Sequence, residues 1–421
     1  MRFKFHTLLA LCILSTTLSS HPASAQTMTL RKVVALVRHS IRSQDIGAPN
    51  SLAAPYSPLN WPTYGVSRGS LTATGTAFAK NMGGYYADLY AALGLKAASQ
   101  CPPTNNGVFV WSDNRTPRTI ATGTAFLTGA FPGCGLSAHF YQSTSNDPLF
   151  YYNNNISLTA GTPSLSIAPQ MNVMMQIMGA PAGDTYTSSN NPCNSSTSSP
   201  SQTTCADVGD YADEFRLQYA SGLSVNNIAW GSWSSLGIAK QQILNEIQLY
   251  TQWYMADYRA QTNGVANGTF RSENIANQIA LALSQVTTPG TSGGPPTARL
   301  VLFVGHDSTV QALGSLMNAS WTSPDGVSND SPPVSGFVFE LYSDSSGNFF
   351  VRPRFITATL DQMRQNRRLT ANGSNNPGNS TLIIPGCTTQ SVDRCSASTF
   401  ISILNTAIAS TGITPSTVPY N

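Results

Sequence analysis

The chain has 421 residues, more than a single domain usually has, so we expect two domains or one large body with an insertion. Asp, Glu, Lys and Arg make up only 10% of it, well below the roughly 25% of an average soluble protein, and 22 basic residues nearly balance 19 acidic ones. This balance excludes a basic nucleic-acid-binding stripe and an acidic tail, so we expect no nucleic-acid partner.

The N-terminus has the pattern of a secretory signal peptide. Arg2 and Lys4 precede an apolar run over residues 8–14, and small residues occupy positions 23–25. Cleavage after residue 25 would release the mature chain. The apolar run is too short for a membrane span, and no later stretch approaches the roughly 20 apolar residues that a span needs. We therefore expect a periplasmic or secreted protein without a membrane anchor.

Cysteine usage agrees with export. Cys12 lies within the signal peptide, and six cysteines remain as three couples that are close in sequence: Cys101 and Cys134, Cys193 and Cys205, Cys387 and Cys395. An even number in an exported chain indicates disulfides, although six cysteines permit many pairings besides that of nearest neighbours. Zinc binding is the competing interpretation. The chain has no C-x2-C pair, and an oxidising compartment favours disulfides.

Three segments predict a strand, a polar turn and a helix in succession. Residues 30–37 form an almost continuous β-branched run, typical of a strand buried on both faces of a sheet, and residues 72–93 have helical spacing. The pattern recurs with a strand at 108–111 before a helix at 116–130, and with a strand at 300–304 before a helix that reaches residue 317. Residues 337–342 and 349–355 predict a hairpin that adds antiparallel strands.

The middle of the chain has a different composition. Residues 141–210 are rich in Asn, Ser, Thr and Pro, and helical patterns follow at 211–220 and 236–262. We interpret residues 136–265 as an inserted, mainly helical cap on an α/β body formed by residues 26–135 and 266–421.

Charged and imidazole side chains follow the predicted buried strands. In open α/β sheets, ligands bind beyond the carboxyl ends of the strands, so residues exported there converge on one crevice. Three guanidinium groups in one crevice need an anion, and their planar geometry suits phosphate. The residues at or just past these strand ends are Arg38, His39, Arg42, Arg118, His306 and Asp307.

This set predicts phosphoryl transfer through a histidine. Neighbouring cations disfavour an imidazolium, so His39 would stay neutral and could attack phosphorus. Asp307 would protonate the leaving oxygen, while Arg38, Arg42, Arg118 and His306 would bind the phosphate. No G-x-x-x-x-G-K motif occurs, and the chemistry requires neither a metal nor a cofactor. The expected partner is a small-molecule phosphomonoester.

These motifs resemble those of the histidine acid phosphatases, branch 2 of the histidine phosphatase superfamily. Residues 37–42 resemble the R-H-G-x-R-x-P signature, Arg118-Thr119 with Thr122 resembles the R-T-x-x-T segment, and residues 305–310 resemble the H-D element. Residues 212–219 and 229–231 are similar to the bacterial glucose-1-phosphatase and phytase branch. The resemblance implies a three-layer α/β/α body with a mixed central sheet and a smaller helical domain. It also implies a phosphohistidine at His39 and proton donation by Asp307.

The chain departs from the family signature at several positions. Ser40 replaces the family glycine, Gln44 replaces the proline, and Asp45-Ile46 stands where phytase members carry Thr-Lys. An acid at position 45 should weaken the binding of a hexaphosphate, which favours smaller esters such as sugar phosphates. A phytase acting on inositol hexakisphosphate is the alternative.

The activity and two of the side chains each permit a second interpretation. A phosphoryl-transferring mutase and a catalytically inactive phosphosugar-binding relative are the competing functions; export and the intact pair of His39 and Asp307 argue against them. Arg115 could replace Arg118 as the pocket arginine. Glu214 could line the substrate side of the cleft together with Asp45, or could act only as an acid favourable to a helix dipole.

Overall fold

The computed structural model describes residues 27–45, 61–95, 101–102, 106–150, 205–231, 240–248, 251 and 272–420. The predicted signal peptide lies outside these residues. No helix in the described part of the chain combines the length and the apolar character needed to cross a membrane.

One mixed β-sheet forms the centre of the molecule. Within the described residues it has eight strands in the order β3-β2-β4-β1-β5-β6-β7, with β8 paired to β6. The strands are β1 (Thr29–Arg38), β2 (Asn106–Ser112), β3 (His139–Phe140), β4 (Ala298–Gly305), β5 (Gly336–Ser343), β6 (Phe349–Thr357), β7 (Gly378–Thr381) and β8 (Cys395–Ser396). The three predicted buried strands correspond to β1, β2 and β4, and the predicted hairpin corresponds to β5 and β6.

Parallel and antiparallel pairing divide the sheet into two halves. β1 pairs with β4, β4 with β2 and β2 with β3, all in parallel. On the other side of β1, the pairs β1–β5, β5–β6 and β6–β7 are antiparallel. The parallel half is the one that carries Arg38, His306 and Asp307 at its strand ends.

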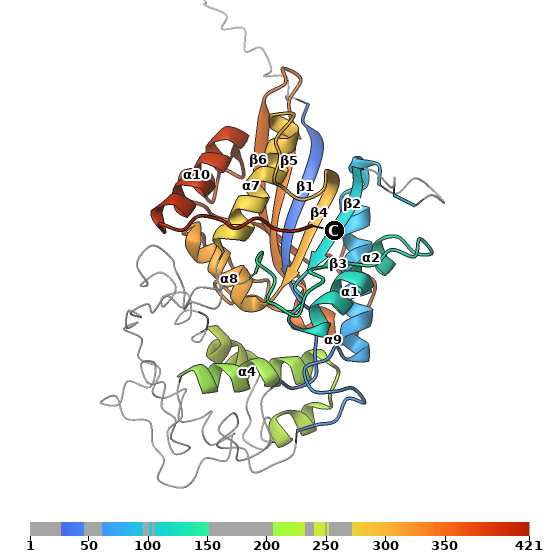
Figure 1. Ribbon diagram of the computed structural model, residues 1–421. Helices are drawn as coiled ribbons and strands as arrows, with labels where there is room; N and C mark the ends of the chain where they lie inside the picture. Colours follow the sequence, from blue (N-terminus) through green and yellow to red (C-terminus); the bar gives the residue numbers. More distant parts are fainter. Residues whose placement is uncertain are drawn as a thin grey trace, which may run out of the picture.

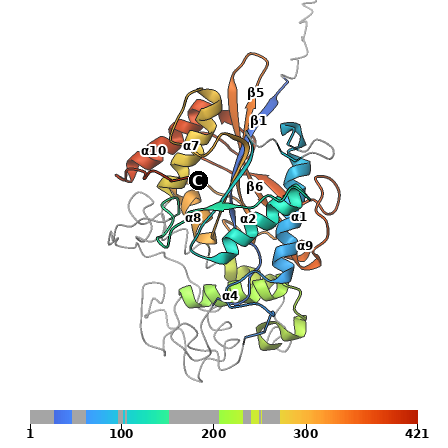
Figure 2. The same cartoon turned by 45° about the vertical axis from the view of Figure 1, so that its right-hand side comes forward.

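Helices cover both faces of the sheet and make three layers (Figure 1, Figure 2). Val34 and Leu36 of β1 join a core with residues of α7 (Glu273–Thr287), α8 (Asp307–Leu316) and α10 (Ala397–Ser410). Val33, Ala35 and Val37 join a second core with residues of α1 (Ala73–Leu89) and α2 (Pro117–Ala130). Successive side chains of a strand point to opposite faces, so burial of both faces explains why the run is apolar throughout.

The helices of the body begin and end close to the positions that their sequence patterns predict. The Thr72 side chain caps α1 by accepting a hydrogen bond from the Gly75 amide, and Pro117 starts α2, where its fixed φ and missing N–H are tolerated. The helices are α1 (Ala73–Leu89), η1 (Ala91–Leu93), α2 (Pro117–Ala130), α7 (Glu273–Thr287), α8 (Asp307–Leu316), α9 (Leu360–Gln365) and α10 (Ala397–Ser410).

The described part of the predicted cap contains β3, α4 (Cys205–Ala220), η3 (Val225–Gly231) and helical residues 240–248. β3 extends the central sheet beside β2, so the sheet reaches into this range. α4 contains the helix predicted at 211–220 and lies beyond the end of the sheet at which β4 finishes (Figure 1). The division into a body and an inserted cap at residues 136 and 265 stays a proposal.

Two of the three cysteine couples form disulfides. Cys101 bonds to Cys134 and ties the segment before β2 to the region after α2, and Cys387 bonds to Cys395 at the start of β8. Both pair nearest neighbours in sequence. Cys193 lies outside the described residues, so its pairing with Cys205 remains a prediction.

Candidate active site

The register of the sheet places three strand ends at one edge. Arg38 is the register partner of Gly305, and Ser112 is the partner of Val304. The backbone continues this alignment past the strands, because the His39 amide donates to the Gly305 carbonyl over 2.8 Å. The residues that follow β1 and β4 therefore meet, as the positions of the charged residues in the sequence suggested.

His39 is held as one neutral tautomer. Its Nδ1 lies 2.8 Å from the Ser40 carbonyl oxygen, and its Nε2 lies 3.0 Å from Nε of Arg118. A carbonyl can only accept and a guanidinium can only donate, so Nδ1 carries the proton and Nε2 carries the lone pair. The side chain is only 2% exposed, and burial together with Arg118 and Arg38 keeps the pKa of His39 well below its usual value.

The residue after His39 packs into the body. The Ser40 amide donates to Oγ1 of Thr122 in α2, and the Ser40 hydroxyl donates to the Gly75 carbonyl in α1. The serine that replaces the family glycine is thus fully buried, with its hydroxyl bonded to a helix.

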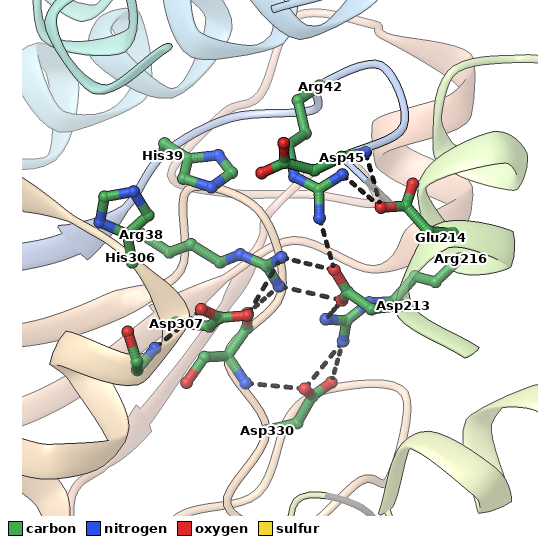
Figure 3. A network of polar contacts seen from close by, with 12 residues as sticks. Arg38, His39, Arg42, Asp45, Asp213, Glu214, Arg216, His306, Asp307 and Asp330 are labelled. Atoms are coloured by element: carbon green, nitrogen blue, oxygen red, sulfur yellow. Dashed lines mark hydrogen bonds and ion pairs between the residues drawn. The ribbon is translucent and has the colours of Figure 1, made fainter. Parts of the chain in front are cut away.

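Arg38 lies between two carboxylates (Figure 3). Its Nη1 and Nη2 bind Oδ1 and Oδ2 of Asp213 at 3.2 and 2.7 Å, and Nη2 lies 3.3 Å from Oδ2 of Asp307. Nη1 also donates to the Ser331 carbonyl. Burial disfavours the charge, but Asp213 and Asp307 outweigh it and raise the pKa of Arg38.

Arg42 is paired with the residue next to Asp213. Its Nη1 lies 2.5 Å from Oε1 of Glu214, which also accepts the Asp45 amide over 3.0 Å. Glu214 is 2% exposed, and burial raises its pKa despite the nearby Arg42. Its contacts in the structure are therefore with the loop that carries Arg42, and a direct contact with substrate stays a prediction.

Arg118 completes the group of three guanidinium groups. Besides its bond to His39, its Nη1 lies 2.9 Å from Oδ2 of Asp45, whose side chain is 39% exposed. Burial and the charge of Arg42 lower the pKa of Arg118. Arg115 is exposed and Arg118 contacts His39, so the geometry favours Arg118 as the pocket arginine.

His306 and Asp307 follow β4, beside His39 and Arg38. The His306 ring stands edge-on to the His39 ring with centroids 5.3 Å apart, and its Nδ1 lies 3.1 Å from Oδ2 of the buried Asp113. Asp307 begins α8, and its Oδ1 accepts the Ser308 amide. Burial disfavours the ionised carboxyl, but Arg38 outweighs it and lowers the pKa of Asp307.

Two carboxylates that hold the arginines of this region were not predicted as site residues from the sequence. Asp213 contacts Arg38 and also Arg216, and Arg216 donates through Nη1 to both oxygens of Asp330 at 2.8 Å. This network joins α4 to the loop that follows α8 (Figure 3). The signal for it in the sequence is the spacing of three between Asp213 and Arg216, which suits an ion pair on one helix.

The described residues contain no group of three or more His, Cys, Asp or Glu side chains placed to hold a metal ion. What the site does contain is a neutral imidazole, three guanidinium groups and a carboxyl linked by contacts: Arg118 with His39, Arg38 with Asp307, and Arg38 and Arg42 with the shared Asp213. Such a set can bind a tetrahedral dianion and transfer it to nitrogen.

A comparison with known families agrees with this geometry. The model of the histidine phosphatase superfamily (branch 2) matches residues 29–355. The chain belongs to this family. The resemblance seen in the sequence motifs is thereby confirmed, and with it the expected α/β fold.

Curated relatives match over nearly their full length. The chain is 25% identical to a glucose-1-phosphatase of Salmonella typhimurium, covering 95% of this chain and 98% of the relative. It is 26% identical to phytase AppA of Escherichia coli over 95% and 96% of the two chains. Among solved structures, the Hafnia alvei phytase in complex with tartrate has a TM-score of 0.73 at 25% identity, covering 90% of this chain and 97% of that one.

Proposed function

We propose that this protein hydrolyses phosphomonoesters through a phosphohistidine at His39. The observation that carries the proposal is the hydrogen bonding of that imidazole: Nδ1 donates to a carbonyl, and the Nε2 lone pair accepts a hydrogen bond from Nε of Arg118. A nucleophile that is neutral and surrounded by cations can approach a phosphate dianion without electrostatic repulsion.

In the first step the Nε2 lone pair forms a bond to phosphorus, and the bond between phosphorus and the ester oxygen breaks. The proton of the Asp307 carboxyl goes to the departing oxygen, which leaves as an alcohol. In the second step Asp307 takes a proton from water, the water oxygen bonds to phosphorus, and the N–P bond breaks. Arg38, Arg42 and Arg118, with His306, stabilise the charge on the transferred group.

Substrate binding favours the protonated form of Asp307. In the free enzyme Arg38 lies 3.3 Å from Asp307 and lowers the pKa of that carboxyl. A bound phosphate dianion pairs with Arg38, which weakens the effect of Arg38 on Asp307, and it adds negative charge beside Asp307. Both effects raise the pKa of Asp307, so the proton is present when the leaving oxygen needs it.

We propose small phosphomonoesters such as sugar phosphates as the substrates. Asp45 is partly exposed beside Arg118, and Glu214 lies next to it behind Arg42. A substrate with many phosphates would bring further negative charge towards these carboxylates. A phytase is the second candidate, because two structures of Hafnia alvei phytase share the fold at 25% and 26% identity. We place the protein in the periplasm or outside the cell.

Kinetics of two variants test the mechanism. His39→Ala should abolish phosphate release from p-nitrophenyl phosphate at acid pH without added metal, and turnover near the parental kcat would refute the assignment. Asp307→Asn should lose roughly 10²–10⁴ in rate on a sugar phosphate and less on the activated ester. Equal losses on both esters would contradict a general acid.

A comparison of kcat/KM for glucose 1-phosphate and phytate tests the substrate class. We expect glucose 1-phosphate to be preferred, and a clear preference for phytate would favour the second candidate. Binding of phosphosugars without turnover would instead identify an inactive relative.

A further inference from the structure

We propose that Asp213 is a positioning residue that divides the charge of Arg38 between itself and Asp307, and thereby sets the pH range in which Asp307 can act as an acid. The inference rests on the proposed function, in which Asp307 must be protonated to donate.

The geometry of Arg38 carries the inference. One nitrogen, Nη2, lies 2.7 Å from Oδ2 of Asp213 and 3.3 Å from Oδ2 of Asp307. Arg38 is 1% exposed, so solvent screens its charge little. The two acids compete for the same donor, and Asp213 has the shorter and bidentate contact.

Asp213 is held in the charged form. Burial works against ionisation, but Arg38 and Arg216 lie against its two oxygens and lower its pKa far below the usual range. A permanent negative charge beside Asp307 disfavours ionisation of that second carboxyl. Asp213 therefore counteracts the pull of Arg38 and keeps Asp307 easier to protonate.

The other groups that face Asp307 act in the opposite direction or weakly. Arg38 from β1 and His306 at the end of β4 favour the ionised carboxyl, as does the Ser308 amide from α8 itself. Arg118 from α2 also interacts favourably with the ionised form. Asp213 from α4 opposes them.

The chain offers a matched control in the next residue. Glu214 lies on the same helix and is also buried, and its arginine partner is Arg42, which Asp213 approaches only to 3.7 Å. Asp213→Asn and Glu214→Gln each replace a carboxylate by an isosteric amide. Both variants remove negative charge from beside Arg42, but only Asp213→Asn removes the Asp213 carboxylate from Arg38, the guanidinium that touches Asp307.

The test is the pH dependence of kcat on glucose 1-phosphate, an ester whose leaving oxygen needs a proton. In Asp213→Asn the alkaline limb of the profile should move to lower pH by about 1 unit, because Asp307 loses its proton more easily. Glu214→Gln should raise KM and leave the limb in place. Asp213→Glu retains the negative charge, so its alkaline limb should lie close to that of the parent.

A limb in Asp213→Asn that coincides with that of the parent, or moves to higher pH, would overturn the inference. If circular dichroism shows that Asp213→Asn does not fold, Asp213→Ser removes the same charge and leaves room for water on Arg38. The limb should disappear in Asp307→Asn; its persistence there would also overturn the inference. Failure of the proposed function is a separate result, since His39→Ala would then retain turnover.

Discussion

The first turn of α1 contacts the loop that carries His39 and Arg42. A Cβ added at Gly75 would lie 1.9 Å from the backbone oxygen of Ile41, between His39 and Arg42. The Ser40 hydroxyl donates to the Gly75 carbonyl over 2.7 Å, and the Thr72 amide donates to the Ile41 carbonyl over 3.1 Å. The helix and the loop are therefore in direct backbone contact, and no flexible side chain lies between them that could move to make room for a Cβ.

Gly75→Ala should impair catalysis without touching a reacting group. Cβ contacts shorter than 3.0 Å essentially do not occur, so helix and loop must separate by about 1 Å. A misplacement of that size can reduce the rate by about 10²-fold. We expect kcat/KM on p-nitrophenyl phosphate to fall by that order, and the free energy of unfolding to fall by about 1–3 kcal/mol.

Gly84 in the same helix provides the control. Its added Cβ would lie 3.6 Å from the Gly129 carbonyl oxygen, an ordinary contact. Gly84→Ala should keep kcat/KM and raise stability in thermal unfolding by about 0.5–1 kcal/mol. If Gly75→Ala kept parental kcat/KM, the backbone contact could not be what positions the loop.

Two further predictions concern charge. Arg118→Met should move the acid limb of the kcat/KM profile to higher pH, because the loss of a nearby cation raises the pKa of His39 and the imidazole is then protonated at higher pH. Arg115→Ala should leave the acid limb unchanged. Identical profiles for the two variants would contradict the assignment of Arg118 as the pocket arginine. Lys32→Met should raise the free energy of unfolding at pH 7 by at most about 3 kcal/mol. The reason is that burial lowers the pKa of Lys32 to about 8, so below that pH the buried side chain is charged and destabilises the fold. The penalty should shrink from pH 8 towards 10.5, and an equal effect of Lys32→Met at pH 7 and pH 10 in denaturant unfolding would refute this explanation.

The parts of the fold that could be predicted are those in which the pattern of apolar residues shows which faces are buried. β1 and β4 are covered on both faces, so their apolar runs were recognisable, and the hairpin of β5 and β6 was marked by its polar turn. β3 has only two residues and no pattern of its own, so it was assigned to the cap instead of to the sheet.

The candidate site was predictable where residues follow strands. Arg38, His39, His306 and Asp307 were located because parallel strands end at one edge. Asp213 and Asp330 could not be found in this way. The spacing of three between Asp213 and Arg216 indicates an ion pair on one helix, but it does not show that Asp213 reaches Arg38, and Asp330 has no such signal. Both acids are buried because of how α4 packs against the end of the sheet.

Trapping the covalent intermediate would show whether His39 is the nucleophile. In the proposed mechanism Asp307 also assists the attack of water, so Asp307→Asn mixed with p-nitrophenyl phosphate should accumulate a phosphoryl group. Peptide mass spectrometry after a rapid quench at alkaline pH should locate it. We expect the mass of one phosphoryl group on the peptide that contains His39, and none in His39→Ala. Phosphorylation at another residue, or burst-free turnover with no protein-bound phosphate, would rule out a phosphohistidine at this position.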